Sequence, residues 1–530
     1  MHENQLKKMM SGAAILSAGA LGVKMLSAIY RIVFQNFTGS EGFYVFQQVY
    51  PFYGLAVTLS LNGLPVFLSK MIAEKENSAE QRAISKRILM ILMVICTGLF
   101  LGIFLGAERL ADGMGDGELM PLIRVASWMF LFVPFLSVAR GYFQGQLYMT
   151  PTAVSQLIEQ VVRVVVILIA ATQFYLYGGS LYVMGTWALQ SSWLSALSAS
   201  IVLVIFGWKK WMQGRESILP PTATLPSYPY LFKRLVTEGL SVSLIASLLI
   251  ILQFIDSFTV YKGLINSGYS AHQAMVTKGV YDRGQLLVQL AMVVSTGLAS
   301  GLLPLLRMQE RAGKPKAFLR TSHSILRIRM VISSAASVGL IAIMPQVNQG
   351  LFNESVGNDV LQVFVLTVVV FSLIHAYHAI LQSIDQHRLI LLGVLIAGLT
   401  KWIGNIVLVP MIATRGASIS TVLSMVVMYI ALRVLSPKQL KTILLEKKFI
   451  VGLALSLFGM ALSVRGVVSF LIMISPVSEL GRNSNLIFAL ISAGIGALIF
   501  RCLLIRTNVL TIREWLSIPF GKQIMRGRRK

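Results

Sequence analysis

Residues 12–34 read GAAILSAGALGVKMLSAIYRIVF, a stretch whose only charges are Lys24 and Arg31. About 20 apolar residues cross the hydrocarbon core of a bilayer as one helix, so this stretch predicts a transmembrane helix. The two cations are about two helical turns apart and therefore share one helix face. A Lys or Arg in the middle of a span costs about 2.5–3.5 kcal/mol on insertion scales, so a favourable interaction must offset that cost.

Two interpretations of this pair are open. In the first, Lys24 and Arg31 line a water-filled cavity, where an anionic ligand or a carboxylate stabilises them. In the second, they extend along the helix to the lipid headgroups, which is a longer reach for Lys24 than for Arg31. The first interpretation, which we favour, predicts a transporter with a cationic cavity.

The composition is typical of an all-α, polytopic membrane protein. Of the 530 residues, 55% are hydrophobic and only 13% are charged. The net charge of +25 does not indicate nucleic-acid binding, because the cations gather in alternate loops between the apolar segments. Cys96 and Cys502 lie in apolar segments and indicate neither a disulfide nor a metal site.

Apolar segments long enough to cross a bilayer recur along the whole chain. No cleavage pattern of a signal peptide follows the first, so we expect that helix to be retained. The fourteen predicted spans are residues 11–34, 44–69, 88–107, 120–139, 152–175, 182–207, 236–261, 281–305, 325–345, 359–383, 388–411, 414–435, 449–471 and 485–505.

The loops between these segments alternate in charge. On one side, loops 35–43, 176–181 and 346–358 contain no Lys or Arg. By the positive-inside rule the opposite, cation-rich side is cytoplasmic, which places both termini inside and requires an even number of spans. The main exceptions are Lys262, Lys278 and Arg283, in or beside loop 262–280. The cation-rich stretches are 70–87, 208–235, 306–330, 433–448 and the tail after residue 505.

Four prolines between residues 220 and 229 mark a linker near the middle of the chain. We therefore predict a six-helix bundle at 1–207, a cytoplasmic linker at 208–235 and a second six-helix bundle at 236–435. Two extra transmembrane helices and a basic cytoplasmic tail follow at 436–530.

The two predicted bundles resemble each other at one offset. Gln144 aligns with Gln382 (382 − 144 = 238), and at the same offset Arg163 aligns with Lys401. An even number of spans separates the two halves, so both run in the same direction. Such a parallel repeat predicts a substrate site between the halves.

Further charges fall inside the predicted spans. Glu159 and Arg163 are four residues apart on one helix, so either they line the site or they neutralise each other. Without them, cations outnumber carboxylates, and this excess favours an anionic ligand. Candidates for lining or ion coupling are Glu159, Arg163, Glu238, Asp256 and Asp282.

The cations that remain suit phosphate oxygens, because guanidinium donates in a bidentate fork and ammonium supplies a point charge. A lipid diphosphate is an anion that must cross a membrane while its tail stays in lipid. We therefore predict a diphosphate site formed by Lys24, Arg31, Arg283 and Lys401.

Motifs that support catalysis are absent from the sequence. There is no G-x-x-x-x-G-K-[ST], no H-E-x-x-H and no C-x-x-C. We predict that the chain is not an enzyme, has no cofactor or bound metal, and implies no P-loop ATPase subunit. Its energy would come from an ion gradient, the membrane potential or substrate flux.

Several short stretches have the character of family motifs. They are Gly39–Tyr44 (GSEGFY), Gly63–Lys70 (GLPVFLSK), Arg140–Gly145 (RGYFQG), Thr150–Gln160 and Tyr281–Gln285 (YDRGQ). With the layout of six, six and two helices, they resemble the multidrug/oligosaccharidyl-lipid/polysaccharide exporter superfamily. Within it, they are most similar to the bacterial polysaccharide-exporter branch, which includes stage V sporulation protein B-like proteins and is related to lipid II flippases.

This resemblance implies alternating access on a lipid-linked sugar in a bacterial cytoplasmic membrane. In lipid II flippases, arginines on spans 1, 2 and 8 line the cavity, and the resemblance carries the first and last of these onto Lys24 and Arg283. Arg31 is one residue past a second family position, which is Tyr30 here. The predicted second span carries no cation, and Leu286 stands where the family has a glutamate.

We therefore predict a flippase that translocates a polyprenyl-diphosphate-linked saccharide. Its partners would be that lipid and the surrounding membrane lipids, and not nucleic acid. The alternative is a cation-coupled multidrug exporter of the same fold, in which Asp256 or Glu238 contacts an organic cation. A third hypothesis is a membrane scaffold for envelope assembly that transports nothing.

Overall fold

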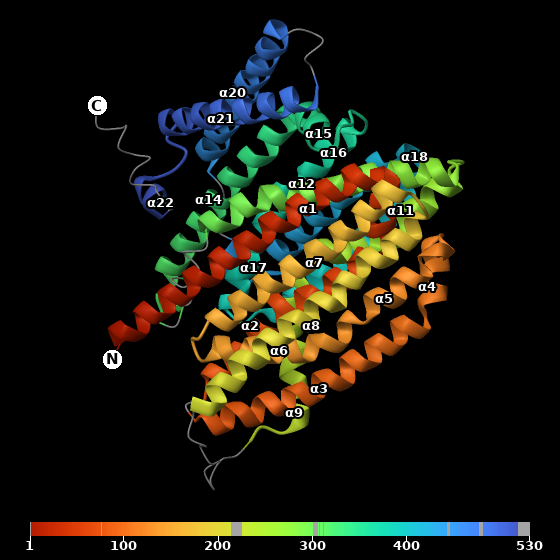
Figure 1. Cartoon of the computed structure of the whole chain (residues 1–530). Helices are drawn as coiled ribbons and strands as arrows, with labels where there is room; N and C mark the ends of the chain where they lie inside the picture. Colours follow the sequence, from red (N-terminus) through yellow and green to blue (C-terminus); the bar gives the residue numbers. More distant parts are fainter. Residues whose placement is uncertain are drawn as a thin grey trace. The chain divides into compact units, whose positions relative to one another are not determined.

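The computed structural model describes residues 2–75, 77–213, 225–299, 306, 308–310, 312–441, 446–475 and 481–517. Every regular element in these residues is a helix (Figure 1). Eleven of the helical stretches found there are long and apolar enough to cross a membrane. The prediction of an all-α, multi-pass membrane protein is therefore confirmed. The side chains of residues 2–18, 20, 21, 24, 208–213, 293–299, 438, 441 and 517 lie outside the described part.

The chain divides into two compact units, Met1–Gly279 and Val280–Lys530. Unit 1 contains α1 (His2–Thr58), η1 (Leu59–Gly63), α2 (Leu64–Ala73), α3 (Ser78–Leu105), α4 (Ala107–Met114), η2 (Gly117–Leu119), α5 (Met120–Ser127), α6 (Met129–Gly145), α7 (Thr150–Tyr177), α8 (Leu181–Gln213), α9 (Tyr228–Arg234), η3 (Leu235–Gly239), α10 (Leu240–Ala246) and α11 (Leu248–Asn266).

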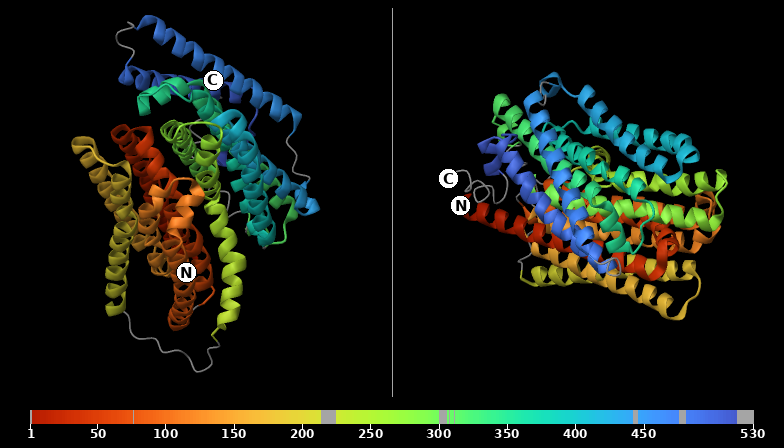
Figure 2. Two further views of the ribbon diagram at one scale, coloured as in Figure 1. Left: turned by 90° about the vertical axis from the view of Figure 1, so that its right-hand side faces the viewer. Right: turned by 90° about the horizontal axis from the view of Figure 1, so that it is seen from above.

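The boundary between the units falls within α12 (Ala271–Ala299). Unit 2 continues with α14 (Pro315–Ala342), α15 (Met344–Phe352), α16 (Asn358–Val365), α17 (Thr367–Ser383), α18 (His387–Leu435), α19 (Lys438–Lys441), α20 (Lys447–Ile474), α21 (Arg482–Arg506) and α22 (Ile512–Ser517). In this unit, α20 and α21 lie side by side (Figure 2).

Two of the membrane-long stretches, Met25–Ala73 and His387–Leu435, are each 49 residues long. At 1.5 Å per residue such a helix is about 74 Å long, more than twice the hydrocarbon core. Non-helical backbone interrupts the first at Gly39 and the second at Ile412 and Ala413. Each stretch therefore has room for two crossings, and the count of fourteen spans with cytoplasmic termini stays a prediction.

The seventh predicted span packs within unit 1, along the second. The Phe52 and Phe254 rings are 4.8 Å apart, and Gln48 Nε2 donates to the Ser257 carbonyl at 2.6 Å. At Gly63 the two segments are so close that a Cβ would lie 2.2 Å from Ser243 Oγ. Only glycine fits this crossing. The predicted boundary between two bundles in the linker stays a prediction.

The internal repeat predicted from the sequence is visible in the helix boundaries. The pair α5 and α6 breaks at Trp128, and the pair α16 and α17 breaks at Leu366, 238 residues later, with the same φ and ψ of −57° and −26°. Left-handed residues also recur at this offset, at Leu147 and Asp385. The backbone of this part of unit 1 is thus repeated in unit 2.

Candidate functional site

In unit 1, two predicted cations meet a group of tyrosines that we call the arginine–tyrosine cluster: Tyr30, Arg31, Tyr50, Tyr53 and Arg163. Arg31 is 1% exposed; its Nε donates to the Tyr30 hydroxyl at 3.3 Å, and its guanidinium lies 4.5 Å from the centre of the Tyr50 ring. Arg163, from α7, donates to the Tyr53 hydroxyl and lies 5.0 Å from the centre of that ring.

This cluster concentrates positive charge inside the membrane. The Arg31 and Arg163 guanidinium groups are close enough to repel each other. The tyrosine rings reduce the cost of burial, because each presents the negative face of its π system to a cation. The hydroxyl groups of Tyr30 and Tyr53 add hydrogen bonds to the same cations. The arrangement suits an anion better than an organic cation.

Glu159 does not neutralise Arg163, so that alternative is wrong. Its Oε2 instead pairs with Arg140 Nη2 at 2.6 Å, and both side chains are buried. Arg140 also donates to the carbonyl of Ser60 in η1 at 3.1 Å and to Ser155 at 3.2 Å. Arg140 is a buried charge that was not among the predicted site residues, although it begins the RGYFQG motif.

In unit 2, Arg283 is fully buried and is held by the loop between α15 and α16. Its Nη2 lies 2.5 Å from Glu354 Oε2, and its Nη1 donates to Asn348 Oδ1 at 3.2 Å. The guanidinium also lies 5.1 Å from the centre of the Phe352 ring. The guanidinium of Arg283 therefore already binds an oxyanion, which is the carboxylate of Glu354 from the same chain.

Lys401 is also fully buried in unit 2, on α18. Its Nζ donates to Thr421 Oγ1 at 2.6 Å, to the Ala417 carbonyl at 3.0 Å and to the Tyr281 hydroxyl at 3.4 Å. Tyr281 comes two residues before Arg283, so α12 links the two cations of this unit. Together they form the unit-2 cation pair.

The repeat relates the cations of the two units. Arg163 and Lys401 occupy equivalent positions, and each donates to a tyrosine. Tyr53 belongs to the second predicted span, and Tyr281 begins the eighth, which is its counterpart in the repeat. Each unit therefore contains a buried cation held by a tyrosine from an equivalent span.

The other predicted site residues have different surroundings. Glu238 lies in η3, where it accepts from Lys70 at 3.0 Å and from Arg234 at 2.8 Å; Arg234 also pairs with Glu74 at 3.0 Å. The hydrogen bond with Glu74 is the main cause that raises the pKa of Arg234 above its ordinary value. We call these four residues the linker-end ion network.

Asp256 on α11 and Asp282 on α12 are both fully buried. Neither is therefore exposed to solvent in the structure. Lys24 belongs to α1, but its side chain lies outside the described residues. Its predicted role in diphosphate binding stays a prediction.

A second polar cluster in unit 1 is centred on Asp116 and contains none of the predicted site residues. The Asp116 carboxylate accepts from Tyr44 at 3.0 Å and from Tyr182 at 2.9 Å. Burial raises the pKa of the Asp116 carboxyl above its ordinary value, although these two hydrogen bonds act to lower it. Only tertiary structure brings these residues together, since no sequence spacing links them.

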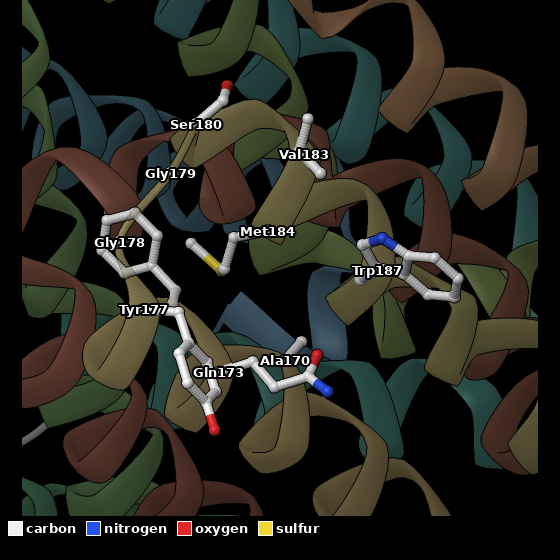
Figure 3. A pocket seen from close by; sticks show the side chains of 10 residues that line it. Ala170, Gln173, Tyr177, Gly178, Gly179, Ser180, Val183, Met184 and Trp187 are labelled. Atoms are coloured by element: carbon white, nitrogen blue, oxygen red, sulfur yellow. The ribbon is translucent and has the colours of Figure 1, made fainter.

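Unit 1 also has a pocket of about 280 Å³ where α7 turns into α8. Figure 3 shows Tyr177 and Trp187 on opposite sides of it, with Met184 between them. Tyr177 is 85% exposed and Trp187 is 62% exposed. Exposed Tyr and Trp are typical of helix ends at a membrane surface. The pocket includes none of the predicted site residues.

Comparison with known proteins gives consistent matches. Residues 9–309 match the family described as polysaccharide biosynthesis protein. The uncharacterized membrane protein YabM of Bacillus subtilis (strain 168) is 33% identical over 98% of this chain and 96% of that protein. From the same organism, the lipid II flippase MurJ is 27% identical over 78% of this chain and 80% of that protein, and stage V sporulation protein B is 25% identical over 79% and 81%.

Several solved structures have a similar fold, and two of them represent the two kinds of transporter found. The lipid II flippase MurJ in an inward closed conformation gives a TM-score of 0.66 at 12% identity, covering 93% of this chain and all of that one. An inward-facing multidrug resistance transporter of the MATE family gives 0.58 at 16% identity, covering 78% of this chain and 96% of that one. The second is assigned to the same exporter superfamily that the sequence motifs resemble.

Proposed function

The chain belongs to the polysaccharide biosynthesis protein family, and from that membership we propose that it translocates a polyprenyl-diphosphate-linked saccharide across the bacterial cytoplasmic membrane. The relatives support this proposal, because one is a lipid II flippase. They also bear out the predicted membership of the exporter superfamily.

The observation that carries the proposal is the environment of Arg283. A fully buried guanidinium that binds a carboxylate has the geometry to bind a phosphate oxygen in its place. Lys401 supplies a second buried cation in the same unit. We propose that these two residues bind the diphosphate and that the arginine–tyrosine cluster of unit 1 contributes further positive charge. Translocation by alternating access is part of the same proposal.

The test is flipping of a fluorescent polyprenyl-diphosphate saccharide in proteoliposomes. We expect Arg283→Ala and Lys401→Ala each to lower the initial rate by about tenfold or more, since a charge-assisted hydrogen bond contributes about 1.5–3 kcal/mol. Arg415→Ala, which removes an exposed cation of the same unit, is the matched control. Unchanged rates in both site variants would refute the assignment.

The multidrug exporter of the same fold is the second candidate. The MATE structure supports it only at the level of fold. It requires a carboxylate that is available to an organic cation, but Glu238 is already engaged by two cations of the linker-end ion network. Increased drug sensitivity of a deletion strain, together with absence of lipid flipping, would favour this candidate over the first.

A further inference from the structure

Glu354 lies on the loop between α15 and α16 and holds the guanidinium that the proposed function assigns to diphosphate. We propose that Glu354 is an internal competitor for Arg283, so that its return to the arginine displaces the bound diphosphate and releases the lipid. The inference rests on the proposed function, because it needs Arg283 to bind the substrate.

The two partners differ sharply in exposure. The Arg283 side chain is fully buried, whereas that of Glu354 is 37% exposed. Glu354 can therefore move into water at low cost, but Arg283 cannot follow it. A buried guanidinium that loses a carboxylate partner is destabilised until another anion replaces that partner. The pair thus has two favourable arrangements, one with Glu354 bound and one with a foreign oxyanion bound.

The backbone of the loop that carries Glu354 favours one position, in which the loop lies against α12. Left-handed residues bracket it, Asn353 with φ 57° and Gly357 with φ 80°. Gly357 lies against α12 so closely that a Cβ would be 2.4 Å from Val280 Cγ1. Since glycine alone suits both the φ and the close approach, the loop is seated directly on the helix that carries Arg283.

Asn348 connects the arginine to this loop. Its Oδ1 accepts from Arg283, while its Nδ2 donates to the Val356 carbonyl at 2.9 Å and to Asn358 Oδ1 at 3.0 Å. Displacing Glu354 therefore leaves the hydrogen bond from Arg283 to Asn348 in place, and this bond keeps the guanidinium oriented. This arrangement orders the arginine for a second oxyanion without removing the loop.

The position of the loop gives the competition a direction. Loop 346–358 contains no Lys or Arg, and charge alternation along the chain predicts that it is outside the cell. A competitor on that side acts on substrate that has already crossed. In this way Glu354 favours release over return.

The experiment measures binding of farnesyl diphosphate to the purified, full-length protein in nanodiscs by isothermal titration. We expect Glu354→Gln to bind the probe about tenfold more tightly than the unmodified protein, because the competing charge is gone. Asp359→Asn is the matched control, since it removes an exposed carboxylate five residues further along the chain. It should leave the affinity unchanged. Glu354→Asp keeps the charge on a shorter side chain and should give an intermediate affinity, which guards against a variant that fails to fold.

The Arg283→Ala background separates this inference from the proposed function. There, the gain from Glu354→Gln should disappear, because no guanidinium remains to compete for. If Arg283→Ala weakens binding but Glu354→Gln does not strengthen it, Glu354 is no competitor and the diphosphate site stands. If Arg283→Ala leaves binding unchanged, or the unmodified protein does not bind the probe, the site and the inference both fall.

Discussion

Arg140 Nη2 and Glu159 Oε2 lie 2.6 Å apart, and both side chains are buried inside unit 1. Arg140 joins three elements, because it also donates to the Ser60 carbonyl in η1 and to Ser155 in α7. The pair therefore cross-links α6, α7 and the π-helical turn of the second predicted span. Its environment points to a structural role rather than to ligand binding.

We expect Glu159→Gln to destabilise the protein by about 3–5 kcal/mol, because it leaves the Arg140 charge buried without a carboxylate. The double variant Arg140→Met with Glu159→Leu should lose less, since neither charge is then buried. Unfolding in mixed micelles measures both, with the exposed Glu108→Gln as the control. Equal losses in the single and double variants would show that the charge pair is not what stabilises this site.

The linker-end ion network should hold the seventh predicted span against the second. Glu238→Lys breaks its pairs with Lys70 and Arg234, and we expect a loss of about 1 kcal/mol because the network is partly exposed. That loss would raise the reactivity of Ser243→Cys toward a water-soluble maleimide by about fivefold, measured with Cys502→Ser as background.

Reversing the whole network supplies the control. Lys70→Glu, Glu74→Lys, Arg234→Glu and Glu238→Lys together restore every pair with opposite sign, so reactivity at position 243 should return toward the original value. A reversed network that is as reactive as Glu238→Lys would contradict the role of these ion pairs.

Asp116 predicts a pH dependence of stability. Because burial raises the pKa of its carboxyl in the folded protein, the folded state holds the proton more tightly than the unfolded chain. Stability should therefore be highest below the unfolded pKa of about 3.9 and should fall as the pH rises through the raised value. The midpoint of thermal unfolding, measured from pH 4 to 8, tests this. Asp116→Asn should reduce the dependence of this midpoint on pH. An identical dependence in both proteins would contradict the role of Asp116.

The crossing of Gly63 and Ser243 predicts a steric effect. In Gly63→Ala the new Cβ would lie 2.2 Å from Ser243 Oγ and 2.9 Å from Ser243 Cα, so the helices must separate. Overpacking of this kind costs about 1–3 kcal/mol. Ser243→Gly in the same chain removes the nearest atoms and should recover part of the loss in thermal stability. No recovery would mean that the clash is not the cause.

The sequence predicted the helical fold well, because long apolar segments and loop charges carry most of that information. The alignment of Gln144 with Gln382 also located a repeat that the breaks at Trp128 and Leu366 bear out. The side on which α10 and α11 pack could not be predicted. Helices in a membrane are apolar all round, so their pattern does not identify their neighbours.

The site was predictable only in part. Arg31, Arg163, Arg283 and Lys401 stood out as charges inside apolar segments, and all four are buried. Their partners did not stand out, because Tyr53 and Glu354 are ordinary residues of a helix and a loop until the tertiary structure brings them to a cation. The alternative in which Glu159 neutralises Arg163 was wrong for the same reason. The spacing of two residues along α7 does not reveal that Arg140 of α6 lies beside Glu159.

The π-helical turn η1 places an extra residue in the backbone of the second predicted span and frees the Ser60 carbonyl for Arg140. Deleting one residue from 59–63 would return that turn to ordinary α geometry and rotate one flank of the helix by about 100° relative to the other. Arg140 would then lose its acceptor, the Ser60 carbonyl. If the contact between Gly63 and Ser243 stayed in place, Tyr53 would no longer face Arg163. During evolution, substitutions around this turn are therefore tolerated far more readily than an insertion or deletion within residues 59–63.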